Sequence, residues 1–426
     1  MSLLDRRRPG STAPRIVLCT ALVVAFATAG AAPTSRVAPV ERRAATECAD
    51  RLAGVPVAPS WYVAPMAAAT LDDAALFLGW PYYQFAPRSD TLTVLDTGAV
   101  GFIARRAGAV AGVAQPVQGL RMEDPRLRRV SGDAVDVVFA ATIDRATPSE
   151  RLSGLTLWGG RLDRDGWHDV SRVAQLGKRS VAARQIAGDG ASYRDELVAG
   201  VLDLNDEFAH SRLVLIRGRS GAWRVEYPLP TLINATYLDL LRFRDTLWIA
   251  TIAEAVDESA GRIRTGIWLS YQSGAGWAAP RLVREDDMQR IREPRLIGSR
   301  EGLVVAWRDR DPAGAVLRWR GAGAREKEKP HERRIASFLT RGTESFSNLL
   351  SAGEDDTTAA IFELTPDSSF VRARVRTVVS MPALVMGPAT APIAIAPASA
   401  GPSGPYPVWL EQFDLRCMLA ADGSRR

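Results

Sequence analysis

The sequence has little cysteine and histidine, with three residues of each among 426. His168, His210 and His331 lie far apart without the spacing of metal ligands, so we predict no zinc site. A glycine-rich phosphate loop, a Gly-x-Ser-x-Gly elbow and a cysteine cluster are also absent from the sequence. These absences argue against nucleotide and metal chemistry, and we predict no cofactor and no metal.

Long apolar runs are missing too, because no segment reaches the roughly 20 residues that a transmembrane helix needs. The apolar run Ile16–Ala27 follows four arginines and precedes the small residues Ala29–Ala32, a pattern typical of a secretory signal over residues 1–32. We therefore expect an exported chain, secreted or periplasmic, that has no transmembrane segment after cleavage. An uncleaved membrane anchor is the alternative.

The charge balance gives no support to nucleic-acid binding. The formal net charge is +6, and the signal holds four Arg and one Asp, so removing its +3 leaves about +3. That value is small for a chain of this length, whereas nucleic-acid-binding domains concentrate basic charge.

Two cysteines remain after signal cleavage, Cys48 near the start of the mature chain and Cys417 near its end. In an oxidising compartment such a pair predicts a disulfide, and two unpaired buried thiols are the alternative. Closing so long a loop would stabilise the fold by roughly 5 to 6 kcal/mol in the chain-entropy model. The bridge would place the two termini side by side.

The stretch Gly266–Arg281 contains the unit from which the chain is built. The first half of this stretch alternates apolar and polar residues, and a glycine-spaced turn, a Trp and a second short run follow. This pattern predicts a strand, a hairpin turn and a second strand. The turn tryptophans Trp167, Trp223 and Trp277 lie 56 and 54 positions apart, which marks a repeat. A period in the fifties with about four strands in it is typical of propeller blades.

The number of repeat units follows from the apolar segments, each of which is predicted to form the buried strand of one unit. There are seven of them: Asp73–Trp80, Asp133–Ile143, Glu196–Leu204, Thr246–Ala253, Gly302–Arg308, Thr358–Leu364 and Tyr406–Leu415. Six units are complete, and the last strand would pair with an N-terminal segment, because a closed ring leaves no open edge. We predict an all-β, six-bladed propeller; seven blades and two stacked sandwiches are the alternatives.

The domain organisation follows from these segments. Residues 1–32 form the signal, 33–59 an irregular arm, 60–417 the propeller and 418–426 a tail. The charge run Arg325–Arg334 is expected to be a solvated loop or a strand edge. Residues Met386–Pro405, rich in Pro, Ala and Gly, are expected to form a surface loop beside one edge strand, Ile393–Ala396.

A family resemblance rests on the turn Ser270–Trp277, which reads Ser-Tyr-Gln-Ser-Gly-Ala-Gly-Trp. It resembles the Asp-box of sialidase-type propellers, Ser-x-Asp-x-Gly-x-Thr-Trp, with Gln272 in place of Asp and Gly276 in place of Thr. The resemblance implies that the Ser and Asp positions bond the turn backbone and that the Trp packs into the blade. With the repeat period, the likeness covers most of residues 60–415.

The resemblance also implies a chemistry: three Arg on a substrate carboxylate, a Tyr nucleophile helped by a Glu, and an Asp acid. The Arg-Ile-Pro element expected in the first blade is absent, because Tyr62–Met66 reads Tyr-Val-Ala-Pro-Met. A missing carboxylate-binding Arg favours a propeller that does not cleave sialic acid.

Two segments carry the candidate site. Arg121-Met-Glu-Asp-Pro-Arg126 and Arg292-Glu-Pro-Arg295 precede equivalent strand pairs in blades two and five, and they resemble elements of five-bladed glycosidases and phosphorylases. Paired carboxylates from separate blades would act as acid and base if they lay about 5 to 10 Å apart. The candidate catalytic residues are Asp124, Glu293 and Tyr237, and the candidate substrate-binding residues are Arg121, Glu123, Arg126, Arg292 and Arg295.

Each candidate has a structural alternative. In the two segments, the Pro would end one blade and start the next, with Glu and Arg pairing for stability, and Tyr237 would be a rim aromatic. We favour a monomeric, non-catalytic propeller that binds a glycan, a cell-envelope component or a protein at the central mouth. The alternative is an exo-sialidase-like glycoside hydrolase using carboxylates and Arg from blades two and five.

Overall fold

The computed structural model divides the chain into two units, Met1–Pro39 and Val40–Arg426, and every described residue lies in the second. The described ranges are 49–51, 61–71, 74–85, 92–93, 100–105, 110–113, 116–117, 120–130, 133–143, 156–173, 181–193, 196–205, 210–219, 222–274, 276–311, 314–336, 339–341, 348–354, 358–376, 383–386, 392–399 and 408–414. Every regular element in these ranges is a β-strand, which confirms the all-β class.

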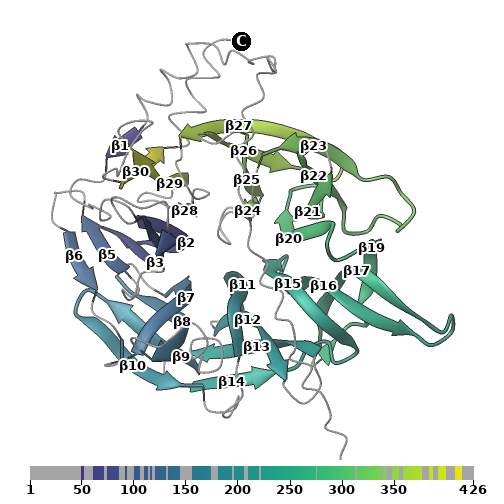
Figure 1. Cartoon of the computed structure of the whole chain (residues 1–426), viewed down its shortest axis with the longest axis horizontal. Helices are drawn as coiled ribbons and strands as arrows, with labels where there is room; N and C mark the ends of the chain where they lie inside the picture. The colour runs from purple at the N-terminus through teal and green to yellow at the C-terminus, as the bar shows by residue number, and fades with distance from the viewer. Residues whose placement is uncertain are drawn as a thin grey trace, which may run out of the picture. The chain divides into compact units, whose positions relative to one another are not determined.

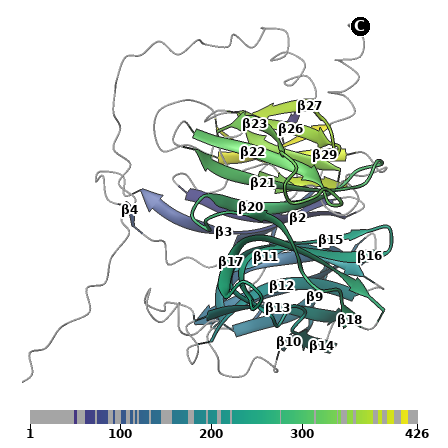
Figure 2. The ribbon, with the colours of Figure 1, turned by 90° about the vertical axis from the view of Figure 1, so that its right-hand side faces the viewer.

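The strands of the described ranges form seven antiparallel sheets, numbered here in chain order; Figure 1 labels most of their strands, and Figure 2 labels β4 and β18. Sheet 1 holds β2 (Trp61–Leu71), β3 (Ala74–Phe85), β4 (Leu92–Thr93), β5 (Val100–Arg105) and β6 (Val110–Val113). Sheet 2 holds β7 (Leu120–Arg129), β8 (Val135–Ile143), β9 (Thr156–Asp163) and β10 (Gly166–Arg172). Sheet 3 holds β11 (Val181–Tyr193), β12 (Glu196–Asn205), β13 (His210–Arg219) and β14 (Ala222–Glu226).

The remaining four sheets continue the pattern. Sheet 4 holds β15 (Leu232–Phe243), β16 (Thr246–Asp257), β17 (Arg262–Ser273), β18 (Gly276–Trp277) and β19 (Arg281–Glu285). Sheet 5 holds β20 (Ile291–Gly298), β21 (Leu303–Asp311), β22 (Gly314–Gly321) and β23 (His331–Ile335), side by side in Figure 2. Sheet 6 holds β24 (Leu339–Arg341), β25 (Leu349–Gly353), β26 (Thr358–Leu364) and β27 (Ser369–Arg376). Sheet 7 holds β28 (Ala383–Met386), β29 (Pro392–Ser399), β30 (Val408–Asp414) and β1 (Ala49–Arg51).

Sheet 7 is the reason that the described sheets outnumber the six blades preferred in the sequence analysis. The expected edge strand Ile393–Ala396 lies within β29, and β29 pairs with β28, which ends at Met386, the first residue of the expected surface loop. β30 pairs with β29 on one side and with the N-terminal β1 on the other, where Ala49 lies opposite Phe413. The described sheets therefore number seven, the count that the sequence analysis kept as an alternative.

Consecutive sheets contact one another through their first strands. β2 contacts β7, and the series continues through β11, β15, β20, β24 and β28, which in turn contacts β2. Sheets 2, 3, 5 and 6 are meanders of strands that follow one another in the chain, as propeller blades are, whereas sheet 7 adds β1 from the other end of the chain.

The core lies between neighbouring sheets, and β21 shows how the sequence produces it. Leu303, Val305 and Trp307 pack in the cluster between sheets 4 and 5, whereas Val304 and Ala306 pack in the cluster between sheets 5 and 6. Because side chains alternate between faces of a strand, one apolar run supplies both interfaces. Burying each large side chain contributes about 1.5–3 kcal/mol.

The Asp-box-like turn lies between β17 and β18 and joins sheet 4 to sheet 3. The Ser270 hydroxyl donates to the Ala278 carbonyl oxygen at 2.5 Å, and Gly274 has a φ of 59°. The Gln272 side chain accepts a hydrogen bond from Arg217 at 3.2 Å, and the Trp277 indole donates to Glu226. Trp277 also packs against the core between sheets 3 and 4.

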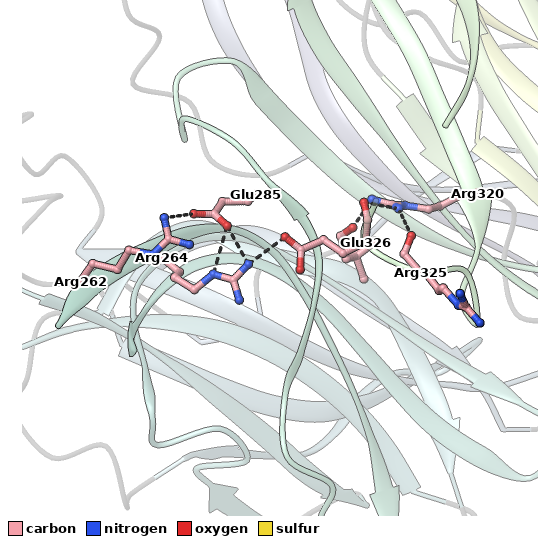
Figure 3. A network of polar contacts seen from close by, with 7 residues as sticks. Arg262, Arg264, Glu285, Arg320, Arg325 and Glu326 are labelled. Atoms are coloured by element: carbon pink, nitrogen blue, oxygen red, sulfur yellow. Dashed lines mark hydrogen bonds and ion pairs between the residues drawn. The ribbon is translucent and has the colours of Figure 1, made fainter. Parts of the chain in front are cut away.

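The charge run after Arg325 divides between a loop and the edge strand β23, which confirms the expectation for this segment. The Arg320 guanidinium donates to the carbonyl oxygens of Arg325 and Glu326 at 2.8 and 3.0 Å. Figure 3 shows Arg264 between two carboxylates, with Glu285 of sheet 4 at 2.7 Å and Glu326 of the loop at 2.8 Å. These contacts fasten the loop of sheet 5 to the outer strands of sheet 4.

Several expectations fall outside the described residues. They concern the signal over residues 1–32, most of the arm over 33–59, the tail over 418–426, and both Cys48 and Cys417. The disulfide therefore stays a prediction. Across the described ranges, no helix is long and apolar enough to cross a membrane.

Candidate functional site

The first strands share an irregularity at the positions that the sequence singled out. Pairing with the second strand shifts between Glu123 and Arg126 in β7, and between Arg292 and Arg295 in β20. A similar shift lies between Ile233 and Tyr237 in β15. Such bulges aim side chains differently from the regular ladder and are common beside functional sites.

Glu293 occupies the bulge of β20 and is almost fully buried, with 6% of its surface exposed. One carboxylate oxygen accepts a hydrogen bond from the Arg308 guanidinium at 2.8 Å, and the other accepts the Leu339 backbone N–H at 2.9 Å. Its φ of 51° is unfavourable for a residue with a side chain, so these bonds must offset backbone strain. Glu293 thus joins sheet 5 to the first strand of sheet 6.

Arg295 strengthens the same junction. Its guanidinium donates to the Leu339 carbonyl oxygen at 3.2 and 3.0 Å from two nitrogens. The backbone N–H and the carbonyl of Leu339 are therefore held by two neighbouring residues of β20.

Tyr237 and Arg292 meet between sheets 4 and 5. The Arg292 guanidinium carbon lies 5.7 Å from the centroid of the Tyr237 ring, within the range of a cation–π contact. The two side chains are each partly exposed, and the Tyr237 ring packs against the core between the sheets. The structure thus brings together Tyr237, Arg292, Glu293 and Arg295 from the predicted set.

The residues predicted from blade two all lie on β7: Arg121, Glu123, Asp124 and Arg126. Glu123 and Arg126 flank the bulge, so Asp124 holds the position in β7 that Glu293 holds in β20. The side chains of these four residues lie outside the described part of the structure. The separation between the Asp124 and Glu293 carboxyl groups therefore stays untested.

Two buried carboxylates that the sequence analysis did not single out support the same region. Asp239, with 1% of its surface exposed, accepts the Leu296 backbone N–H of the next sheet at 2.7 Å. Asp309 accepts the Trp307 indole N–H at 2.9 Å and pairs with Arg318 at 2.5 Å. Burial raises the pKa of the Asp309 carboxyl above its usual range. Asp239 interrupts an apolar part of β15, a signal that would have found it, whereas Asp309 lies among charged residues at the end of β21, where the sequence carries no such signal.

The described contacts of Glu293 hold two sheets together. Each of its carboxylate oxygens accepts one hydrogen bond, from Arg308 or from the Leu339 N–H, and the side chain is almost fully buried. Within the described ranges, no group of three His, Cys, Asp or Glu could hold a metal ion. The partly exposed side chains beside Glu293 are the guanidinium groups of Arg292 and Arg295 and the ring of Tyr237.

Comparisons with known proteins give distant likenesses. No protein-family model and no curated protein matches the chain. Among solved structures, oligogalacturonate lyase from Vibrio parahaemolyticus is 11% identical with a TM-score of 0.45, covering 86% of this chain and 93% of that one. An α-L-arabinanase from Penicillium chrysogenum is 9% identical with a TM-score of 0.44, covering 69% and 94%. The α-L-arabinofuranosidase of Fusarium graminearum is 10% identical with a TM-score of 0.41, covering 71% and 97%.

Proposed function

We propose that this chain is an exported, sialidase-like, seven-bladed propeller that binds a glycan of the cell envelope without cleaving it. The ligand would lie at the mouth, where the first strands begin. Support for a closed ring comes from the pairing of β1 with β30 and from the contact of β28 with β2.

The observation that carries the non-catalytic proposal is the engagement of Glu293. Its carboxylate is buried against Arg308 and the Leu339 backbone, and these bonds hold sheets 5 and 6 together. A general acid or base needs an oxygen within reach of the substrate. Glu293 therefore has a structural role in joining sheets 5 and 6. The first strands present groups that bind a ligand rather than a general acid and a general base.

Tyr237 and Arg292 supply the binding chemistry. A partly exposed phenol ring offers an apolar face to a sugar and a polar hydroxyl at its edge. The guanidinium beside it offers several fixed donors to hydroxyl or acidic groups. A glycan presents both kinds of surface, which favours it over a purely apolar ligand.

The test is a binding screen of the purified protein against immobilised envelope glycans, with Tyr237→Ala beside the unchanged protein. We expect affinity to fall by up to about tenfold, since aromatic contacts contribute about 0.5–1.5 kcal/mol. Phe370→Ala is the matched control, because Phe370 is also exposed and lies against an arginine, Arg372 at 5.3 Å, but on the outer strand β27.

Equal losses of affinity in both variants, or unchanged affinity in Tyr237→Ala, would show that the ligand does not bind at the mouth. Binding to proteins of the envelope but to no glycan would replace the glycan with a protein partner.

A further inference from the structure

Glu254 lies on β16, beside the start of the first strand of sheet 4. It is directly opposite Ile233, the second residue of β15, and on its other side directly opposite Thr265 of β17. The Asn234 side-chain amide donates a hydrogen bond to one of its carboxylate oxygens, Oε2, at 2.7 Å. The other oxygen, Oε1, accepts no hydrogen bond from a residue of the described ranges. The carboxylate is therefore held at the mouth with one oxygen available to a ligand.

The Glu254 side chain points to the same side of sheet 4 as the Tyr237 ring. Ile252 lies opposite Tyr237, and both belong to the core between sheets 4 and 5. Side chains alternate along a strand, and β16 pairs with β17 without a register shift, so Glu254 shares the face of Ile252. Val256, the next residue on that face, is 62% exposed. This face of the β16–β17 hairpin therefore opens to solvent just beyond Glu254.

Glu254 differs from comparable glutamates in lacking a counter-charge. It is partly buried, and in the described part of the chain no Arg or Lys lies within 4 Å of its carboxylate. Every other Glu whose side chain is described and not exposed pairs with an Arg at 3.6 Å or closer; they are Glu196, Glu226, Glu285, Glu293, Glu354 and Glu363. Withdrawing a charge from water without a counter-charge costs free energy. A cation supplied by the ligand would offset that cost.

We propose that Glu254 binds an ammonium group of the ligand, so that the glycan is one built from amino sugars whose amines are free rather than acylated. Oε1 would accept a charge-assisted hydrogen bond from the ammonium, while Asn234 holds Oε2 and so fixes the direction of Oε1. The position opposite Tyr237 lies two residues from Glu254 along β16, about 7 Å away. A sugar that packs on the Tyr237 ring can therefore reach Glu254 with an amino substituent.

This inference rests on the proposed function and names the class of glycan. A glycan without free amines would satisfy the proposed function and contradict the inference. General electrostatics works against the proposed preference, because a chain with a formal net charge of +6 repels a cationic ligand. A preference for the cationic form would therefore report a local negative site.

The experiment measures calorimetric binding of the purified protein to three oligosaccharides of equal length and linkage. They are a glucosamine oligomer with free amines, its N-acetylated form, and the glucose oligomer that carries hydroxyls in their place. The variant is Glu254→Gln, which removes the charge but keeps an oxygen that can accept the hydrogen bond from Asn234. Glu258→Gln is the matched control, because Glu258 is exposed in the turn of the same hairpin.

We expect the free-amine oligomer to bind about tenfold more tightly than either neutral form. Glu254→Gln should abolish this preference, whereas Glu258→Gln should retain it. Raising the pH until the amines lose their protons should abolish the preference of the unchanged protein, and added salt should weaken it. Because no described cation pairs with Glu254, the melting temperature of Glu254→Gln should match that of the unchanged protein.

Equal affinity for all three oligomers, or tighter binding of a neutral one, would overturn the inference and leave the proposed function standing. A preference that Glu258→Gln loses to the same extent would also overturn it, because the charge of the whole hairpin would then be responsible. A preference that persists when the amines are neutral would contradict recognition of an ammonium. Failure of every oligomer to bind would contradict the inference, whereas the envelope screen would still decide the proposed function.

Discussion

Replacing Glu293 should lower the free energy of unfolding rather than the activity of the protein. The contacts of its side chain determine how large this loss should be. Its side chain is 8% exposed and that of Arg308 is 13% exposed, so the pair is largely shielded from water. Each carboxylate oxygen has one partner, Arg308 or the Leu339 N–H. In Glu293→Gln, one of these donors must face the amide NH2 group and loses its acceptor.

The expected loss in unfolding free energy is about 2–3 kcal/mol for Glu293→Gln, the usual cost of losing a hydrogen bond to a charged group. Glu293→Ala removes the carboxylate from the largely buried Arg308 guanidinium, and breaking a buried ion pair in this way costs about 3–5 kcal/mol. The double variant Glu293→Gln with Arg308→Gln should lose less than the sum of the two single losses, because the residues interact directly.

Urea unfolding measures these losses from the shift of the midpoint at constant slope. The control is Glu332→Gln, whose carboxylate is 53% exposed and lies 3.5 Å from Arg318, so that its loss should stay below about 0.5 kcal/mol. If Glu293→Gln is as stable as the unchanged protein, the carboxylate does not fasten the sheets. The argument against its role in catalysis would then fail as well.

Three further outcomes follow from the packing, the buried charge and the termini. Gly266→Ala should destabilise the protein by about 3 kcal/mol or more, because the added methyl would meet the Arg284 carbonyl oxygen, whereas Gly276→Ala meets nothing within 4 Å and should be neutral. Burial raises the pKa of the Asp309 carboxyl, so its contribution is present at low pH and falls as pH rises through that pKa. The stability of Asp309→Asn relative to the unchanged protein should therefore increase as pH rises from about 4, the usual pKa of an aspartate, through the raised pKa. The exported protein should contain no free thiol at Cys48 or Cys417, and mass spectrometry before and after reduction would contradict the bridge if it showed two thiols.

Strand positions could be predicted from the sequence because each buried strand is a continuous apolar run. Thr358–Leu364 is β26 as expected, and Gly302–Arg308 falls almost wholly within β21. The number of sheets could not be predicted, because only one edge strand was expected before the last buried strand, whereas β28 and β29 both precede β30 in sheet 7. β1 is three residues long, β28 is four residues long, and β29 lies in a segment whose Pro, Ala and Gly content is typical of loops.

The candidate site was predicted only in part. The Pro-containing segments Glu293–Pro294 and Asp124–Pro125 do mark equivalent bulges, as their shared place before a strand pair indicated. The partners of Glu293 could not be found, because Leu339 lies 46 positions along the chain and nothing in its sequence marks its backbone as a donor. Burial and long-range pairing, which decide whether a carboxylate is free to react, depend on tertiary structure.

The most direct test of the non-catalytic proposal is turnover. The purified, folded protein would be incubated with a panel of fluorogenic glycosides that includes a sialoside, beside the variants Asp124→Asn and Glu293→Gln. The account predicts no release of fluorophore above the rate without protein. Release that either variant abolishes while remaining folded would contradict the account and establish a glycoside hydrolase acting through the first strands of sheets 2 and 5.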